Sequence, residues 1–193
     1  MTPLNRRSFL ATSTKLVAGG SLLTLAASPL LAQAPAPAAR PKSPPKPPAP
    51  PPEKVQAVVG QAHRSLEEVR KLVEETPLLA NACWDWGGGD FETPLEAAAH
   101  TGQRAIAEYL LGKGARPSLY AAAMLGQLDL VKAHLAVDPN AHAIPGPHGF
   151  TVLHCAKEGK AAAVVEWLLA QGVPDVTHRP LNFVWPEGAK PTA

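Results

Sequence analysis

The sequence lacks the motifs by which catalytic and metal-binding sites are usually found. Its two cysteines do not form a Cys-x-x-Cys pair, and none of its seven histidines belongs to a His-Glu-x-x-His motif. His142, His148 and His154 are spaced by six residues, which fits no pair of ligands on one helix face. A serine nucleophile elbow and a phosphate-binding glycine loop are also absent. We therefore expect no enzymatic activity, no cofactor and no metal ion.

Negative charge is missing from the first quarter of the chain. No Asp or Glu precedes Glu53, whereas six of the 18 Lys and Arg residues do. The remainder therefore holds 12 basic residues against all 16 acidic ones, a net charge of −4. A domain that is acidic and has no basic stripe lacks the electrostatic footprint for binding nucleic acid. We exclude nucleic acid as a partner.

Residues 1–34 are expected to form an export signal. The run Asn5-Arg6-Arg7-Ser8-Phe9-Leu10 resembles the twin-arginine motif, whose specific positions are here Arg6, Arg7, Phe9 and Leu10. The apolar stretch that follows contains Gly and Pro and is too weakly apolar for a membrane span, which needs about 20 strongly apolar residues. The resemblance implies export of a folded protein to the periplasm.

Removal of this signal is open to several interpretations. Small residues permit cleavage after Ala32, Ala34 or Ala38, but Pro35 hinders the second of these. An uncleaved segment would tether the protein to the inner membrane. Membrane contact is expected only through such a segment or through the basic linker that follows.

Residues 35–54 are expected to form an extended linker rich in Pro, Ala and Lys. Ten of the 22 prolines lie between Pro35 and Pro52. Such a composition favours polyproline II, whose rise of about 3.1 Å per residue would let it reach about 55 Å. A spacer is the favoured interpretation, and a ligand for a proline-binding domain is the alternative.

A repeating pattern occupies residues 55–178. Residues 93–102 read TPLEAAAHTG, residues 117–126 read PSLYAAAMLG, and residues 151–156 read TVLHCA, each followed by an apolar segment such as VVEWLL at 164–169. Leu119 and Leu153 are 34 positions apart, close to the repeat length of about 33 residues expected for one known repeat type. The pattern resembles the ankyrin-repeat family. The resemblance implies an all-α solenoid of about four helix-turn-helix repeats.

The first repeat is weaker in sequence. Its expected inner helix carries an apolar stripe, and a Ser65–Glu68 capping box is expected to open its outer helix, whose stripe consists of Leu66, Val69, Leu72 and Val73. Leu95 and Leu119 are only 24 positions apart, so the loop between the second and third repeats is expected to be deleted. One inserted residue is expected near 161–163. Cys83 and Cys155 are about two repeats apart and are expected to be free thiols, with Cys155 half-buried.

The resemblance implies binding through inner helices and through the loops between repeats, called fingers below. The first finger, residues 84–92, combines aromatic and acidic side chains around three glycines, and the second finger covers residues 144–150. The two fingers are expected to frame a recess over Tyr120 and Met124. The expected contact residues are Trp84, Asp85, Trp86, Asp90, Phe91, Glu92, Tyr120, His148 and Phe150. The alternative is that the first finger is an ordinary turn with one tryptophan packed beneath it.

Residues 179–193 have no helical period and are expected to cap the last repeat or, alternatively, to serve as a recognition tail. The sequence as a whole predicts an exported, non-enzymatic module that binds another protein, as an adaptor or stabiliser of a periplasmic protein. The alternative is an accessory protein that handles a small ligand or metal through the acidic, aromatic first finger.

Overall fold

The computed structural model describes residues 46–181 of the chain. The expected export signal with Arg6, Arg7, Phe9 and Leu10, most of the linker and residues 182–193 of the tail lie outside the described residues. Within the described part, no helix is both long enough and apolar enough to cross a bilayer.

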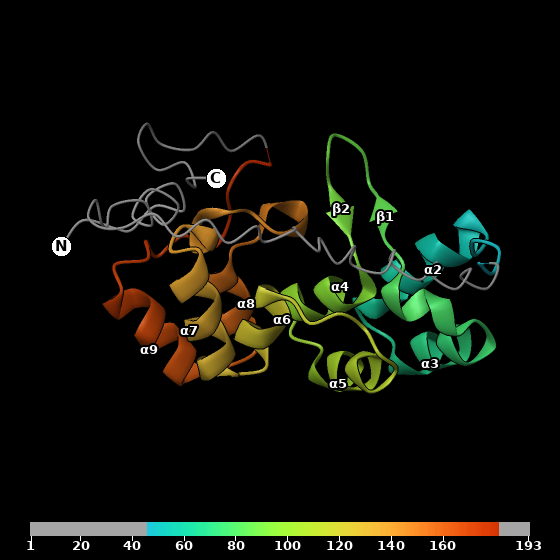
Figure 1. The fold of residues 1–193 in the computed structure, drawn as a ribbon, viewed down its shortest axis with the longest axis horizontal. Helices are drawn as coiled ribbons and strands as arrows, with labels where there is room; N and C mark the ends of the chain where they lie inside the picture. The colour runs from blue at the N-terminus through green and yellow to red at the C-terminus, as the bar shows by residue number, and fades with distance from the viewer. Residues whose placement is uncertain (1–45, 182–193) are drawn as a thin grey trace, which may run out of the picture. The chain divides into compact units, whose positions relative to one another are not determined.

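Four helix pairs follow one another along the described residues (Figure 1). Each pair is an inner helix followed by an outer helix, which confirms the expected all-α repeat fold. The pairs are α2 (Pro52–Ala62) with α3 (Leu66–Glu75), α4 (Pro94–His100) with α5 (Arg104–Gly112), α6 (Leu119–Met124) with α7 (Leu128–Val137), and α8 (Val152–Glu158) with α9 (Ala162–Ala170).

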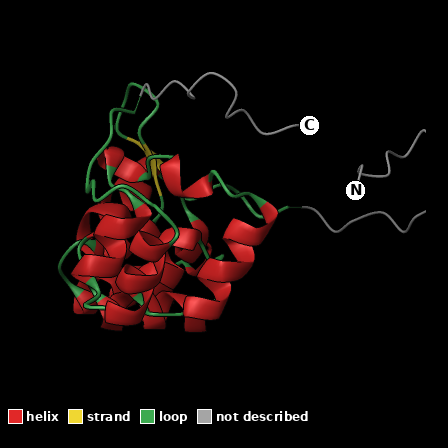
Figure 2. Cartoon of the chain, turned by 90° about the vertical axis from the view of Figure 1, so that its left-hand side faces the viewer, coloured by secondary structure: helices red, strands yellow, loops and turns green. Residues whose placement is uncertain are grey.

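Shorter elements connect the pairs. They are the 3-10 helices η1 (Pro77–Asn81), η2 (Ala141–Ala143) and η3 (Pro147–Gly149), and the two-residue strands β1 (Trp84–Asp85) and β2 (Phe91–Glu92). The strands pair antiparallel with Trp84 opposite Glu92, so the first finger is a short hairpin. Figure 2 shows the paired strands of the hairpin, in yellow, at one end of the helices.

Hydroxyl side chains fix where three of the four inner helices begin, namely α4, α6 and α8. Thr93, Ser118 and Thr151 each accept a hydrogen bond from a backbone N–H three residues later, which satisfies a donor that the helix itself leaves open. Ser65 does the same for α3 by accepting from the Glu68 N–H at 3.3 Å. The fully reciprocal capping box of the second repeat joins Thr93 and Glu96.

Small side chains let the inner helices pack closely. The alanines at 97–99 in α4 and 121–123 in α6 are all buried, as are Val58 and Val59 in α2. Gly159, which ends α8, lies so close to α6 that an added Cβ would sit 1.9 Å from the Met124 carbonyl oxygen. The four inner helices therefore form a continuous core of neighbouring repeats.

The link between α8 and α9 corrects the expected insertion. Residues 159–161 separate these helices just as residues 101–103 separate α4 from α5, so no residue is inserted. Lys160 stands where Gly102 and Gly126 stand in the preceding repeats, and all three have positive φ angles (53°, 68° and 74°). The missing glycine at this turn gave the appearance of a shifted register.

The other expectations about connections have mixed outcomes. Only residues 113–118 join α5 to α6, so the finger between the second and third repeats is missing, as predicted. Cys83 and Cys155 are both free thiols, but Cys155 is fully buried in α8 rather than half-buried. Within the described part of the tail, the Arg179 N–H donates to the Gly149 carbonyl at 2.7 Å, so the chain returns along the second finger.

Candidate functional site

A recess of about 440 Å³ lies between the two fingers. Tyr120 lines it, as predicted, and its hydroxyl donates a hydrogen bond to the Ile144 carbonyl at 2.9 Å. Met124, expected at its floor, is fully buried in α6. The complete lining consists of Gly89, Asp90, Phe91, Glu96, Tyr120, Ile144, Pro145, Gly146, Pro147 and Leu181. The lining is therefore largely apolar, with two carboxylates.

The aromatic residues of the first finger have different environments. Phe91 is 58% exposed and Trp86 40% exposed, whereas Trp84 is partly buried against the core. The Asp85 carboxylate accepts a hydrogen bond from the Gly87 N–H at 2.8 Å and so stabilises the hairpin turn. Of these residues, Phe91 both lines the recess and offers apolar surface to a partner.

Glu92, expected among the exposed contact residues, is fully buried. The strand β2 turns its side chain inward, beneath Trp86, whose indole N–H donates to Glu92 Oε2 at 2.8 Å. Asp90 is only 7% exposed and points toward the second finger. A buried carboxylate requires hydrogen-bonding or charged partners, and three histidines supply them here.

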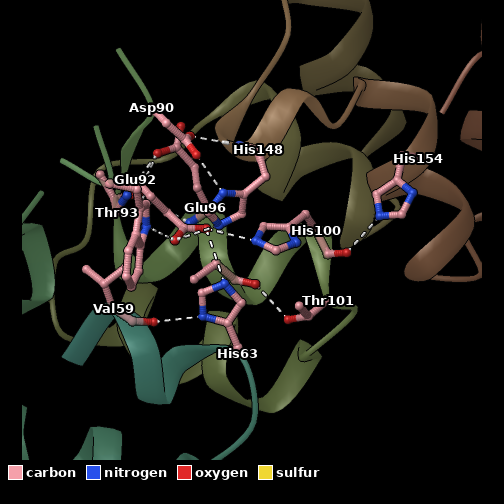
Figure 3. Close-up of polar contacts among 12 residues, drawn as sticks. Val59, His63, Asp90, Glu92, Thr93, Glu96, His100, Thr101, His148 and His154 are labelled. Carbon is pink, nitrogen blue, oxygen red and sulfur yellow. Dashed lines mark hydrogen bonds and ion pairs between the residues drawn. The ribbon is translucent and has the colours of Figure 1, made fainter. Parts of the chain in front are cut away.

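His63, Glu92, His100 and His148 form a compact group, called the Glu92 cluster below (Figure 3). Glu92 Oε1 lies 2.8 Å from His100 Nε2 and 3.5 Å from His63 Nε2. Glu92 Oε2 lies 3.4 Å from His148 Nε2. The three imidazoles therefore converge through the same ring nitrogen on one carboxylate.

Two of these imidazoles form a second hydrogen bond through their Nδ1 atoms. His63 Nδ1 lies 3.0 Å from the Val59 carbonyl oxygen, and His148 Nδ1 lies 2.6 Å from Asp90 Oδ2. Asp90 Oδ1 also accepts the backbone N–H of His148 at 2.8 Å. His148 has a φ of 56°, a left-handed conformation that costs energy for a residue with a side chain, and these hydrogen bonds stabilise it.

The electrostatics of the cluster follow from burial and from these contacts. Burial by itself would raise the pKa of Glu92, but hydrogen bonds with His100, His63 and Trp86 outweigh it and lower that pKa to about 2. The hydrogen bond to Glu92 raises the pKa of His63 above its ordinary value, although burial opposes this. The cluster thus favours the ionised form of the Glu92 carboxylate.

A stack of rings joins the cluster to the fourth repeat. The Phe150 ring lies 4.9 Å from the His100 ring and 4.2 Å from the His154 ring, nearly parallel to both. His154 Nε2 lies 2.9 Å from the His100 carbonyl oxygen, so this nitrogen carries the proton and donates. The ring of Phe150, a residue expected to contact a partner, therefore packs against His100 and His154 inside the protein.

No sequence motif singles out His63 and His100. They lie at the C-terminal ends of the neighbouring inner helices α2 and α4, while Glu92 and His148 come from the two fingers. No local spacing joins such residues. An alignment of the repeats with one another, which places the ends of α2 and α4 side by side, would have been the signal.

Helix pairs stacked through small inner residues, with fingers at one end, define a helical-repeat protein. The family model for the ankyrin repeat matches residues 90–121 and 148–179, which supports the resemblance of these two segments to ankyrin repeats. Such repeats generally serve as protein-interaction domains rather than as enzymes. The matched segments include the first finger's Asp90 and Glu92 and the second finger's His148.

The chain is also similar to a curated protein, alpha-latrocrustotoxin-Lt1a of Latrodectus tredecimguttatus. The two are 30% identical over 118 residues, which cover 55% of this chain and 8% of the toxin. This chain therefore spans only a small part of that relative's length.

Proposed function

We propose that this protein is an exported, non-enzymatic interaction module that acts as an adaptor or stabiliser of another periplasmic protein. The observation that carries the proposal is the recess between the fingers, where apolar side chains remain uncovered on the surface that ankyrin repeats typically use. Phe91 is 58% exposed and Ile144 40% exposed at its rim. Exposed apolar groups clustered in a concavity are typical of protein-binding sites.

The chemistry of the recess describes the segment that would fit it. Phe91, Ile144 and Pro145 provide apolar contact, and Asp90 and Glu96 supply carboxylates within the same lining. A partner segment that inserts an apolar side chain and places a Lys or Arg beside it would match both features. The second and third repeats are joined only by residues 113–118, without a finger. None of these residues lines the recess.

Export is supported by the twin-arginine resemblance around Arg6 and Arg7. Replacement of both by Lys keeps the positive charge but removes the arginine pair that the export machinery reads. We expect the altered protein to accumulate in the cytoplasm, as measured by cell fractionation. Periplasmic recovery of the Arg6→Lys/Arg7→Lys protein at the original level would contradict this route.

Partner binding is tested by affinity purification of the tagged protein from periplasmic extract. The informative variant is Phe91→Ala/Ile144→Ala, because both side chains are exposed and neither holds the Glu92 cluster. Val137→Ala is the matched control, since Val137 is 89% exposed on the outer helix α7. We expect one protein to be recovered at defined stoichiometry with the unaltered chain and the control, and to be lost with the double variant. Equal recovery with all three would move the binding surface away from the recess.

A further inference from the structure

We propose that His63, Glu92, His100 and His148 together bind one zinc ion, which joins both fingers to the inner helices α2 and α4. One ligand atom from each of the four residues lies within 4.8 Å of the corresponding atoms of the others (Figure 3). The sequence predicted no metal ion because it offered no ligand motif. The fold assembles the ligands from four separate segments instead.

The hydrogen-bonding roles within the cluster are unsatisfied unless a further proton or a metal ion lies between its groups. The Val59 carbonyl and the Asp90 carboxylate only accept hydrogen bonds, so Nδ1 of His63 and of His148 must carry hydrogen. In a neutral imidazole, Nε2 then presents a lone pair, and in both residues Nε2 faces the Glu92 carboxylate, which is also an acceptor. Either additional protons or a metal ion must lie between these groups.

The separations between the ligand atoms are near those of a metal site. Zinc binds imidazole nitrogen and carboxylate oxygen at about 2.0–2.2 Å in a tetrahedron, which places ligand atoms about 3.4 Å apart. The three Glu92–histidine separations are 2.8, 3.5 and 3.4 Å. The first two separations are to Oε1 and the third is to Oε2, and the four ligand atoms lie within 4.8 Å of one another, so the side chains must draw together around one ion to complete the coordination.

The donor set selects the class of metal. Three imidazole nitrogens and one carboxylate oxygen suit zinc and related transition metals, whereas calcium and magnesium require mostly oxygen ligands. Metal-binding histidines usually donate their second N–H to a carbonyl or carboxylate, as His63 does to Val59 and His148 does to Asp90. The supporting contacts of a metal site are thus present around the ligands.

The cluster also has an access route. A recess of about 430 Å³, lined by Gly60, His63, Arg64, Trp86 and His148, leads to it from the surface. The side chains of His63 and His148 are 25% and 32% exposed, while Glu92 is fully buried. Because Arg64 lines this recess and repels cations, affinity must come from the ligands rather than from attraction at the entrance.

The test is a calorimetric titration of the metal-free full-length protein with zinc. We expect one ion per chain and a higher melting temperature in its presence. His63→Ala and His148→Asn should each reduce zinc affinity at least about tenfold. Both positions are partly exposed, and Asn tolerates the left-handed conformation at 148, so both variants should fold. His134→Ala on the exposed face of α7 is the control and should bind zinc like the unaltered protein.

A measurement on the unaltered chain tests the zinc site without any variant. Nitrogen-15 NMR of the histidine side chains should show zinc shifting Nε2 of His63, His100 and His148 while Nδ1 of His63 and His148 stays protonated. Absence of zinc binding would overturn the proposal and leave the cluster as a protonated ion-pair network. Binding that persists unchanged in both His63→Ala and His148→Asn, or shifts confined to other histidines, would overturn it as well. Because these experiments use purified protein, their outcome is independent of whether a partner is recovered.

Discussion

Asp90 belongs to one finger but determines the conformation of the other. Its two carboxylate oxygens accept the backbone N–H and the Nδ1–H of His148, which places the His148 ring over Glu92. An amide in this position would have to offer its NH2 group to Nδ1 if its oxygen kept the backbone hydrogen bond. His148 would then carry its proton on Nε2, where the proposed metal binds.

We therefore expect Asp90→Asn to lower zinc affinity by about 10–100-fold, the range typical of groups that orient metal ligands. The measurement is zinc titration calorimetry on the variant beside the unaltered chain. Asp85→Asn is a suitable control because Asp85 stabilises the same hairpin through the Gly87 N–H but does not contact the cluster. Equal affinities for Asp90→Asn and the unaltered chain would show that Asp90 does not orient His148.

The two thiols differ in access and acidity. Cys83 is exposed, whereas Cys155 is 1% exposed and burial raises its pKa to about 12. Because the thiolate is the reactive form and exists mainly above the pKa, Cys155 should be unreactive at ordinary pH. We expect iodoacetamide to alkylate Cys83 at least about tenfold faster than Cys155 in the folded chain.

Peptide mass spectrometry of the alkylated protein measures both rates. An increase from pH 7 to pH 9 should accelerate reaction at Cys83 but leave Cys155 unlabelled, and denaturant should make the two rates similar. Rapid labelling of Cys155 in the folded protein would mean that α8 opens far more readily than its buried position indicates.

At the scale of the element, the packing of α8 on α6 depends on one residue without a side chain. An alanine Cβ at 159 would lie 1.9 Å from the Met124 carbonyl oxygen, and backbone cannot move aside as a side chain can. We expect Gly159→Ala to lower the free energy of unfolding by about 1–3 kcal/mol, as overpacking of a core does. Urea denaturation followed by circular dichroism measures this change.

Gly112→Ala provides the matched control. Gly112 ends α5 within a helix, and an added Cβ would meet nothing within 4 Å. Since alanine has the higher helix propensity, this variant should be equally stable or more stable by up to about 1 kcal/mol. If Gly159→Ala also retained full stability, α6 and α8 would have to be less closely packed than the structure describes.

The helices could be predicted because their signals are local. Thr93, Ser118 and Thr151 mark the helix starts, and the alanine runs after them mark the faces that pack together. The register near residue 160 was misjudged because the turn that usually holds glycine holds Lys160, so one local signal was missing. Because each of these signals lies within one repeat, the helices of a repeat can be predicted only where that repeat carries its own signals.

The candidate site was only partly predictable for a different reason. The recess followed from the deleted finger and from Tyr120, both visible in the repeat spacing. The burial of Glu92 was not predictable, because the side chains that contact it include His63 from the end of α2 and His148 from the second finger, which are distant from it in the sequence. Contacts between distant segments of this kind are set by the stacking of repeats.

At the scale of the whole molecule, repeats normally contact only their neighbours, so stability is shared locally. The Glu92 cluster departs from this because it joins the first repeat, the second repeat and both fingers. We expect zinc to slow amide hydrogen exchange in residues 84–92 and 144–150, and to leave the last turn of α9 unchanged. Mass spectrometry of the exchanged protein measures this pattern.

Uniform slowing along all four repeats would instead indicate that zinc stabilises the chain only by preventing global unfolding. The His134→Ala variant should reproduce the localised pattern, whereas His63→Ala should show little response to zinc in either finger.

Asp90 lines the recess between the fingers, while both of its carboxylate oxygens accept hydrogen bonds from His148. A cationic group of the partner that bound the Asp90 carboxylate would weaken its hydrogen bonds to His148. Zinc binding depends on those same hydrogen bonds, because they orient His148. The two ligands are then thermodynamically coupled, and the coupling must be reciprocal: whatever factor zinc applies to partner affinity, the partner applies to zinc affinity. The availability of a metal in the surroundings would thereby set how firmly the module retains its protein.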